Sequence, residues 1–226
     1  MTLFFRLFAT LAVVLAMLSP AVAGERLQSA VFPPFSTENP IAEEELSEED
    51  LEEMAAGETI VRSRPVPEGY TGTHVMSAAM VPASVEEIFE TVIDCDSLHN
   101  FVPRLEECKN IYAEGADPAT ATTFKQYQKL HFSFAFITRE ITYTNYMFLE
   151  RPHVIGWVLK EGDIDASEGY WRVIPYDDSK NILLYNVFNN PGIAIPRRIQ
   201  ESLTKRDLPG TVEAFRDEIL ARRSEN

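Results

Sequence analysis

The sequence predicts an α+β domain in which a strongly bent antiparallel sheet of about seven strands wraps around one long C-terminal helix. Between residues 109 and 188, apolar and polar side chains alternate in short runs separated by turn residues, which is typical of antiparallel hairpins. From residue 196 onward, apolar side chains recur at helical spacing instead. Two short helices are expected after the first strand. The C-terminal helix is the only one long enough to cover such a sheet.

The N-terminus, residues 1–23, has the order of a secretory signal peptide. Arg6 is followed by an apolar run at residues 7–18 and by small residues at 21–23. The apolar run is about a dozen residues long, whereas a membrane-spanning helix needs roughly 20. We therefore expect a cleaved, exported protein in the periplasm, with secretion as the alternative.

Residues 24–57 are expected to form a proline-containing, acidic extension with a short helix that ends at Gly57, before a folded domain at 58–226. Residues 38–58 hold ten acidic residues and no Lys or Arg. This stretch could be a solvated charged linker or an arm that binds a partner protein. The formal net charge of −15 argues against nucleic acid as a partner, because phosphate binding requires clustered Lys and Arg.

Strands outside the central hairpin are expected at residues 59–66, 73–81, 109–115, 153–162, 167–176 and 181–188. After the second of these, Ser84 and Glu87 have the spacing of a capping box, and the following apolar residues predict an amphipathic helix. A second short helical piece carries Leu98 and Leu105 and is broken at Pro103.

Residues 124–149 predict the central hairpin. Aromatic and aliphatic residues share one face of its first strand: Phe124, Leu130, Phe132, Phe134 and Phe136. The same face of its second strand carries Ile141, Tyr143, Met147 and Leu149. The C-terminal helix begins at Pro196 and is expected to kink at Pro209 and Gly210.

A bent sheet that does not meet its covering helix in full contact leaves a gap, which is a common origin of a ligand cavity of roughly 300–1,000 Å³. The expected walls of this cavity are Phe132, Phe134, Tyr143, Met147, Trp157, Trp171, Ile195, Ile199 and Leu203. The alternative is a filled core, because aromatic residues more often pack than bind a ligand.

Three local patterns point to a family. Residues 81–108 combine an apolar residue, a Pro and a capping residue with a Val-x-x-Ile-Phe helix, followed by an Asp and a Phe-x-Pro segment. Residues 169–171 read Gly-Tyr-Trp before a strand, and an Ile-Pro pair opens the last helix. Over about residues 59–222 the chain thus resembles the START-like, helix-grip superfamily, which includes polyketide cyclases, coenzyme Q carrier proteins and lipid-transfer domains. The resemblance implies a cavity for a lipid, sterol, quinone or polyketide-like molecule.

Motifs for catalysis, metals and cofactors are not found. The histidines His74, His99, His131 and His153 are scattered, no metal-binding spacing occurs, and no glycine-rich loop suggests a nucleotide cofactor. An enzyme would need an ionisable group inside the apolar pocket. Arg139, Glu140 and His131 are nearest, but their positions in the pattern predict that they face solvent. We assign no catalytic residue.

The leading hypothesis is a non-enzymatic carrier of a hydrophobic small molecule. One alternative is a cyclase, dehydratase or hydrolase of the same fold, and another is an envelope module that binds a protein through its acidic arm. Transient contact with a membrane surface could involve Arg197, Arg198, Lys205 and Arg206. Cys95 and Cys108, the only cysteines, could form a disulfide or remain buried thiols.

Overall fold

The computed structural model describes residues 39–66, 68–134, 137–192 and 197–225, with side chains described except at 132–134, 137, 197–209 and 225. The helices within these residues are α1 (Pro40–Glu43), α2 (Glu48–Ala55), α3 (Val85–Ile93), α4 (Cys95–Leu98) and α5 (Arg197–Glu225). The strands are β1 (Ile60–Ser63), β2 (Thr73–Val81), β3 (Leu105–Ile111), β4 (Thr123–Phe134), β5 (Ile137–Glu150), β6 (Val154–Gly162), β7 (Ala166–Pro175) and β8 (Asn181–Asn190).

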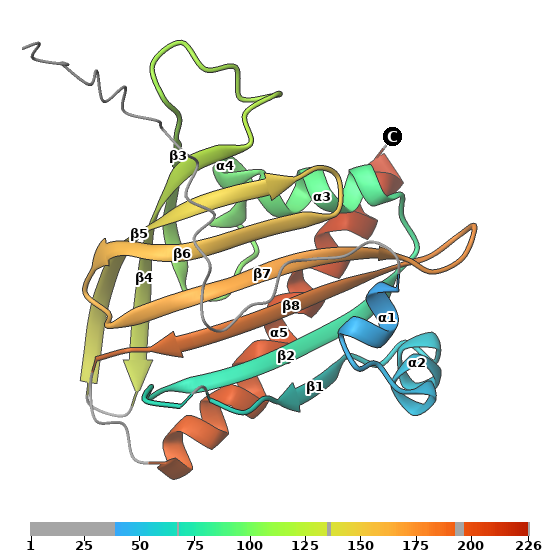
Figure 1. Ribbon diagram of the computed structural model, residues 1–226, viewed down its shortest axis with the longest axis horizontal. Helices are drawn as coiled ribbons and strands as arrows, with labels where there is room; N and C mark the ends of the chain where they lie inside the picture. Colours follow the sequence, from blue (N-terminus) through green and yellow to red (C-terminus); the bar gives the residue numbers. More distant parts are fainter. Residues whose placement is uncertain (1–38, 67, 135–136, 193–196, 226) are drawn as a thin grey trace, which may run out of the picture.

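The strands form one antiparallel sheet in the order β1-β2-β8-β7-β6-β5-β4-β3 (Figure 1). The sheet bends strongly: in Figure 1, β4 runs across the direction of β7, β8 and β2. Helix α5 crosses behind this bend and packs against β1, β2 and β8. The predicted α+β architecture is therefore confirmed.

Two details of the prediction were wrong. The described sheet has eight strands rather than about seven, because the short edge strand β1 pairs with β2 through Ile60 and Ala78. The two short helices follow the second strand, β2, and not the first. The first of them, α3, begins at the capping box, which is present as predicted: the Ser84 hydroxyl accepts from the amide of Glu87, and the Glu87 carboxylate accepts from the amide of Ser84.

The third strand also begins earlier than expected. Helix α4 ends at Leu98, and a turn closes at Arg104, whose φ of +67° lies in the left-handed region. Leu105, which was expected in a helix, is therefore the first residue of β3. A backbone with positive φ cannot continue a right-handed helix, so the chain changes direction here.

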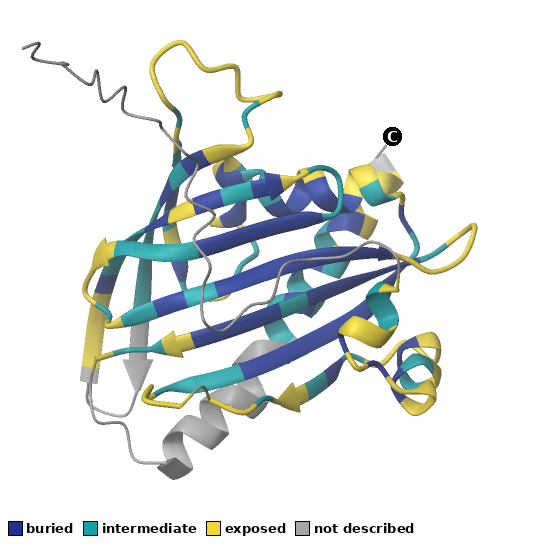
Figure 2. Ribbon diagram, viewed as in Figure 1, coloured by how far each residue is buried: buried dark blue, intermediate teal, exposed yellow. Residues whose placement is uncertain are grey.

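Apolar residues are buried on both faces of the sheet, which accounts for the continuous burial along β2, β7 and β8 in Figure 2. Helices α3, α4 and α5 cover one face, and the cluster there includes Phe89, Trp171 and Phe215. On the opposite face a second cluster forms around Met76 and Ile174 beneath residues of the α1–α2 segment. Alternate side chains of the central strands therefore enter two different cores.

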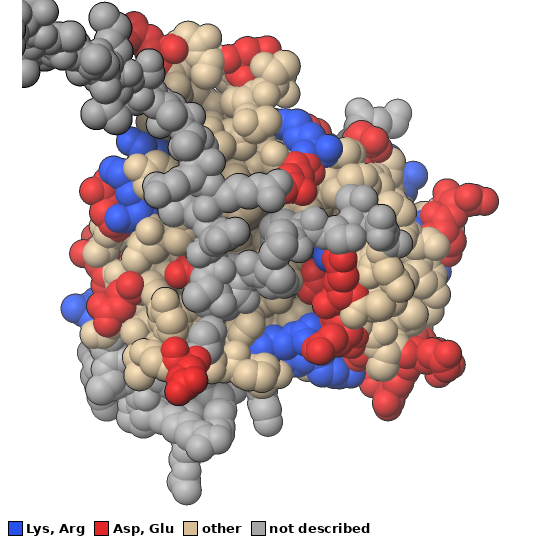
Figure 3. All heavy atoms as spheres, viewed as in Figure 1, with Lys and Arg blue, Asp and Glu red and all other residues tan. Residues whose placement is uncertain are grey.

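Residues 39–57 belong to the folded body, which differs from the solvated linker that was one of the two alternatives for this stretch; the partner-binding arm stays a prediction. Met54 is 1% exposed and packs in the second cluster. Glu44, 4% exposed, accepts hydrogen bonds from Arg172 at 2.9 Å and from the Tyr170 hydroxyl at 2.7 Å. The exposed acidic side chains of this segment gather over α2 at the lower right of Figure 3. Gly57, with φ of +97°, follows the predicted helix.

Helix α5 is continuous from Arg197 to Glu225 through Pro209 and Gly210, where the sequence predicts a kink. Within the described ranges, no helix is both long enough and apolar enough to cross a membrane.

Candidate ligand cavity

A cavity of about 160 Å³ lies between the inner face of the sheet and the covering helices. Side chains from strands β3 to β8 and from helices α3, α4 and α5 line it. None of its lining residues in the described part of the chain is Lys, Arg, His, Asp or Glu. The cavity is smaller than the roughly 300–1,000 Å³ expected from the fold class, so it suits a small molecule or one ring of a larger one.

A stack of aromatic rings forms one wall. Tyr185 lies between two indoles, with ring centroids 5.6 Å from Trp157 and 4.2 Å from Trp171. Phe215 of α5 meets Trp171 edge-on at 4.7 Å. The Trp157 indole occupies the space over Gly169, its partner across β6 and β7, where a Cβ would lie only 2.3 Å from the ring. The sheet and α5 are thus joined by ring contacts beside the cavity.

Polar side chains from β4 and β5 form a row along another part of the wall. The Tyr143 hydroxyl donates to the amide oxygen of Gln128 at 2.6 Å, and the Gln128 amide nitrogen donates to Gln126 at 2.6 Å. Gln126 donates in turn to Asn110 at 3.0 Å, and Asn110 donates to the carbonyl of Ile93 at the end of α3. This row is uncharged and links β5, β4 and β3 to the helix.

Burial raises the pKa of the Tyr143 hydroxyl well above its ordinary value of 10.0. The pKa of Tyr185 is raised mainly by burial and further by the nearby Tyr143. Both hydroxyls are therefore neutral at physiological pH. The cavity can offer neutral hydrogen bonds and aromatic surface, but its tyrosines are poorly matched to proton transfer near neutral pH.

Residues 81–216 match the family described as "Polyketide cyclase / dehydrase and lipid transport". The chain belongs to this family. No curated protein matches the chain.

Solved structures similar to this member of the polyketide cyclase and lipid transport family share its fold. A STAR-related lipid transfer protein from Xanthomonas axonopodis is 16% identical, with a TM-score of 0.57 over 71% of this chain and 93% of that one. The Zhui aromatase/cyclase from Streptomyces sp. R1128 is 19% identical, with a TM-score of 0.51 over 66% and 94%. Human StAR-related lipid transfer protein 5 is 10% identical, with a TM-score of 0.58 over 74% and 84%.

The family and these folds support a START-like domain for a hydrophobic small molecule or for cyclase chemistry. Of the residues that the sequence singled out, the structure brings Tyr143, Met147, Trp157 and Trp171 together around the cavity. The side chains of Phe132, Phe134, Ile199 and Leu203 lie outside the described part, as does Ile195 altogether. Those assignments remain predictions, as does membrane contact through the basic residues of α5.

Sequence reasoning missed the polar row and Tyr185. Gln126, Gln128 and Asn145 stand at inward positions of the two hairpin strands, where the alternation predicts apolar residues. Gln126 pairs directly with Asn145 across the hairpin, and Gln128 pairs with Tyr143. Polar side chains at buried positions of two paired strands were therefore the available signal for a polar patch inside the pocket.

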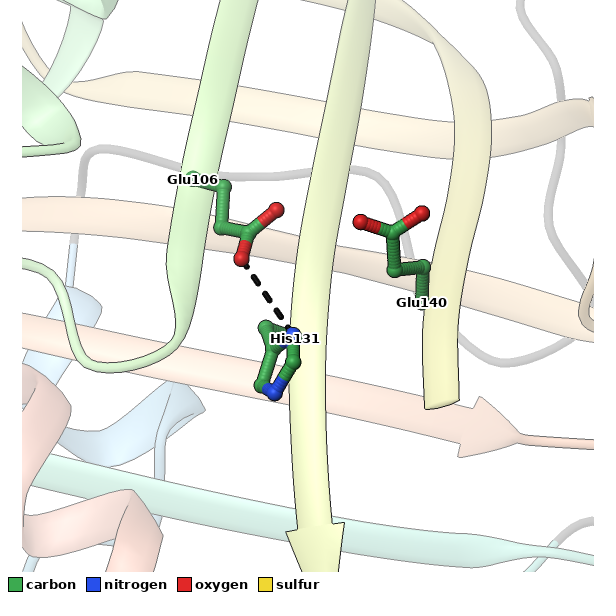
Figure 4. A group of neighbouring side chains, drawn as sticks. All are labelled: Glu106, His131 and Glu140. Atoms are coloured by element: carbon green, nitrogen blue, oxygen red, sulfur yellow. Dashed lines mark ion pairs between the residues drawn. The ribbon is translucent and has the colours of Figure 1, made fainter. Parts of the chain in front are cut away.

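The ionisable residues that the sequence analysis considered for catalysis, Arg139, Glu140 and His131, do not line the cavity. Figure 4 shows Glu106, His131 and Glu140 on neighbouring strands β3, β4 and β5. Among the described residues these are the only three that could share a metal ion, but the Lys129 ammonium lies 3.2 Å from Glu106 and 2.7 Å from Glu140. Hydrogen bonds to Glu140 and Glu106 raise the pKa of Lys129. The lysine already pairs with both carboxylates of this group.

A disulfide joins Cys95 at the start of α4 to Cys108 in β3, with their Cα atoms 5.3 Å apart. Both cysteines are buried in the inner core. Ile93 and Leu98 on either side of Cys95 line the cavity, as does Leu105 before Cys108. The bond therefore fixes one end of the cavity to the edge of the sheet.

Proposed function

We propose that the protein is a non-enzymatic carrier that binds an uncharged hydrophobic small molecule in the cavity between the sheet and α5 and shields it from water. The observation that supports this most strongly is the lining itself, which combines an aromatic stack with neutral polar groups. Such a lining can hold an apolar molecule without placing an acid or base of suitable pKa against it.

We also propose that the carrier works outside the cytoplasm, most simply in a periplasm. The order of residues in the first 23 positions supports export. The Cys95–Cys108 disulfide fits an oxidising compartment. Mass spectrometry of protein from the periplasmic fraction should show a chain that begins at Gly24, and a chain that keeps residues 1–23 would contradict export.

Native mass spectrometry tests the carrier proposal. Protein purified without detergent should retain an apolar molecule in stoichiometric amount, and solvent extraction should release it for identification. Leu130→Trp adds bulk to a cavity wall and should abolish retention, whereas Ile111→Trp changes an exposed side chain and should not. A bare wild-type protein that also takes up no hydrophobic probe would overturn the proposal.

The alternative within the family is a cyclase or dehydrase, and the position of the Tyr143 hydroxyl in the cavity is the feature that favours it. As an enzyme, the Tyr143→Phe variant would keep affinity for a substrate and lose turnover. If the protein is a carrier, the Tyr143→Phe variant would change only the affinity for the bound molecule.

A further inference from the structure

Asn145 carries a polar atom inside the cavity wall that no described residue satisfies. Its side chain is 3% exposed, it lines the cavity, and its Oδ1 is buried without a hydrogen-bond partner. Buried amide oxygens in folded proteins nearly always accept a hydrogen bond, because leaving one unpaired forfeits the bond it would make with water. The missing donor is therefore expected to come from whatever occupies the cavity.

The neighbours of Asn145 give their hydrogen bonds in another direction. Tyr143 donates its only proton to Gln128, and each amide of the row donates onward toward Asn110. Gln126 lies directly opposite Asn145 in the hairpin, yet it accepts a hydrogen bond from Gln128 and donates one to Asn110. The row thus passes Asn145 without a hydrogen bond to it, and Asn145 lines the cavity.

We propose, resting on the carrier function above, that the cavity binds a ring-containing end of an uncharged molecule that carries a hydroxyl group, and that Asn145 accepts the hydrogen bond of that hydroxyl. A hydroxyl both donates and accepts, so it can satisfy an amide in either orientation of its oxygen and nitrogen.

The size of the cavity and the absence of charged residues from its described lining restrict the class of ligand further. Its volume of about 160 Å³ is close to that of an engineered cavity of roughly 150 Å³ that binds benzene. One ring therefore fits against the stack formed by Trp157, Tyr185 and Trp171. Carboxylates and phosphates are disfavoured, because the described lining offers no cation to a buried anion. The ligand class that fits the cavity is therefore phenols and cyclic alcohols.

Three probes of similar size test this assignment. The chain has two tryptophans, Trp157 and Trp171, and both line the cavity, so intrinsic fluorescence reports directly on its occupancy. Protein stripped of bound molecules on a hydrophobic resin is titrated with p-cresol, p-xylene and 4-methylbenzoate, with calorimetry as the second readout. We expect p-cresol to bind about tenfold more tightly than p-xylene, although p-xylene is more hydrophobic, and 4-methylbenzoate to bind weakest.

Asn145→Leu should reverse the preference, so that p-xylene binds more tightly than p-cresol, because the variant removes the acceptor and keeps the shape. Asn100→Leu, at an exposed position outside the cavity, is the matched control and should keep the wild-type preference. If wild-type protein binds p-xylene as tightly as p-cresol, the hydroxyl assignment is wrong while the carrier function stands. If none of the probes binds and the native protein holds no molecule, both proposals are wrong.

Discussion

Gly169 shows how a single missing side chain shapes the cavity wall. A Cβ at this position would lie 2.3 Å from the Trp157 ring and 2.4 Å from the carbonyl oxygen of Asn186. The backbone oxygen cannot move without disturbing the pairing of β7 with β8. The glycine of the Gly-Tyr-Trp pattern at residues 169–171 is therefore a packing requirement of the aromatic stack.

Gly169→Ala is expected to destabilise the protein by about 2 kcal/mol, because overpacking of this kind forces both the indole and the strand to shift. Gly210→Ala is the matched control. Position 210 is helical with open space around it, so alanine there should stabilise by about 1 kcal/mol. Chemical denaturation followed by fluorescence measures both, and equal stability of the Gly169→Ala variant would contradict the close contact.

The buried tyrosines predict a loss of stability in alkaline solution. An unfolded chain releases a tyrosine proton near the ordinary pKa of 10.0, whereas burial raises the pKa of Tyr143 and Tyr185 in the folded protein. The unfolded state therefore binds fewer protons above this pH, and the free energy of unfolding falls as pH rises.

Tyr143→Phe should reduce this fall. Between about pH 9 and about pH 11, the variant should lose about 1.4 kcal/mol less than the wild type, since one pKa unit corresponds to that free energy. The comparison is made within each protein, so the pH-independent effect of leaving Gln128 without its donor cancels. Tyr146→Phe, at a 40% exposed position, serves as the control. Identical pH profiles for wild type and Tyr143→Phe would argue against the buried hydroxyl.

At the scale of elements, the sequence predicted helix α3 and most strands well, because a capping box and strict alternation are local signals. The packing of residues 39–57 against the face of the sheet opposite α5 was not predictable from such local signals. Glu44 becomes buried through Arg172 and Tyr170, more than a hundred residues later in the chain. An acidic run considered by itself resembles a solvated linker, because the sequence nearby does not show that Arg172 binds Glu44 in the fold.

Glu44→Gln is expected to lower the free energy of unfolding by about 2 kcal/mol, because Arg172, which is 3% exposed, would lose its charged bond to Glu44 while keeping the one to Glu43 at 3.0 Å. Glu45→Gln is the matched control: the neighbouring carboxylate is 75% exposed and pairs with Arg64 at the surface, where an ion pair contributes little. Thermal unfolding followed by circular dichroism separates the two. Similar melting temperatures for both variants would mean that the buried pair is not formed in solution.

The disulfide predicts a second effect at the scale of elements. Replacing Cys95 and Cys108 together by Ser should lower stability by about 3 kcal/mol, because the bond limits the freedom of the unfolded chain. A reducing agent should destabilise the wild type by a similar amount and leave the double variant unchanged. An unchanged melting temperature of the wild type under reduction would contradict the pairing.

At the scale of the whole molecule, the sequence was sufficient for the architecture and for part of the cavity. Trp157 and Trp171 were predictable because large aromatic residues at inward positions of adjacent strands enter the same core. The polar row was harder to predict, because Gln126 and Gln128 look like interruptions of an apolar face until the helices enclose them. The size of the cavity likewise depends on how closely α5 approaches the sheet, which no local pattern encodes.

Strand β7 lies between the two cores, and its consecutive side chains point to opposite faces of the sheet. Tyr170 and Arg172 reach the buried carboxylate of Glu44, while Trp171 between them stacks in the cavity wall. A slip of one residue would turn the indole toward the carboxylate and drive the guanidinium into the uncharged cavity. A one-residue shift in the pairing of β7 is therefore unfavourable on both faces of the sheet. On one face it buries an unpaired charge, and on the other it places a bulky ring where a hydrogen-bonding side chain belongs.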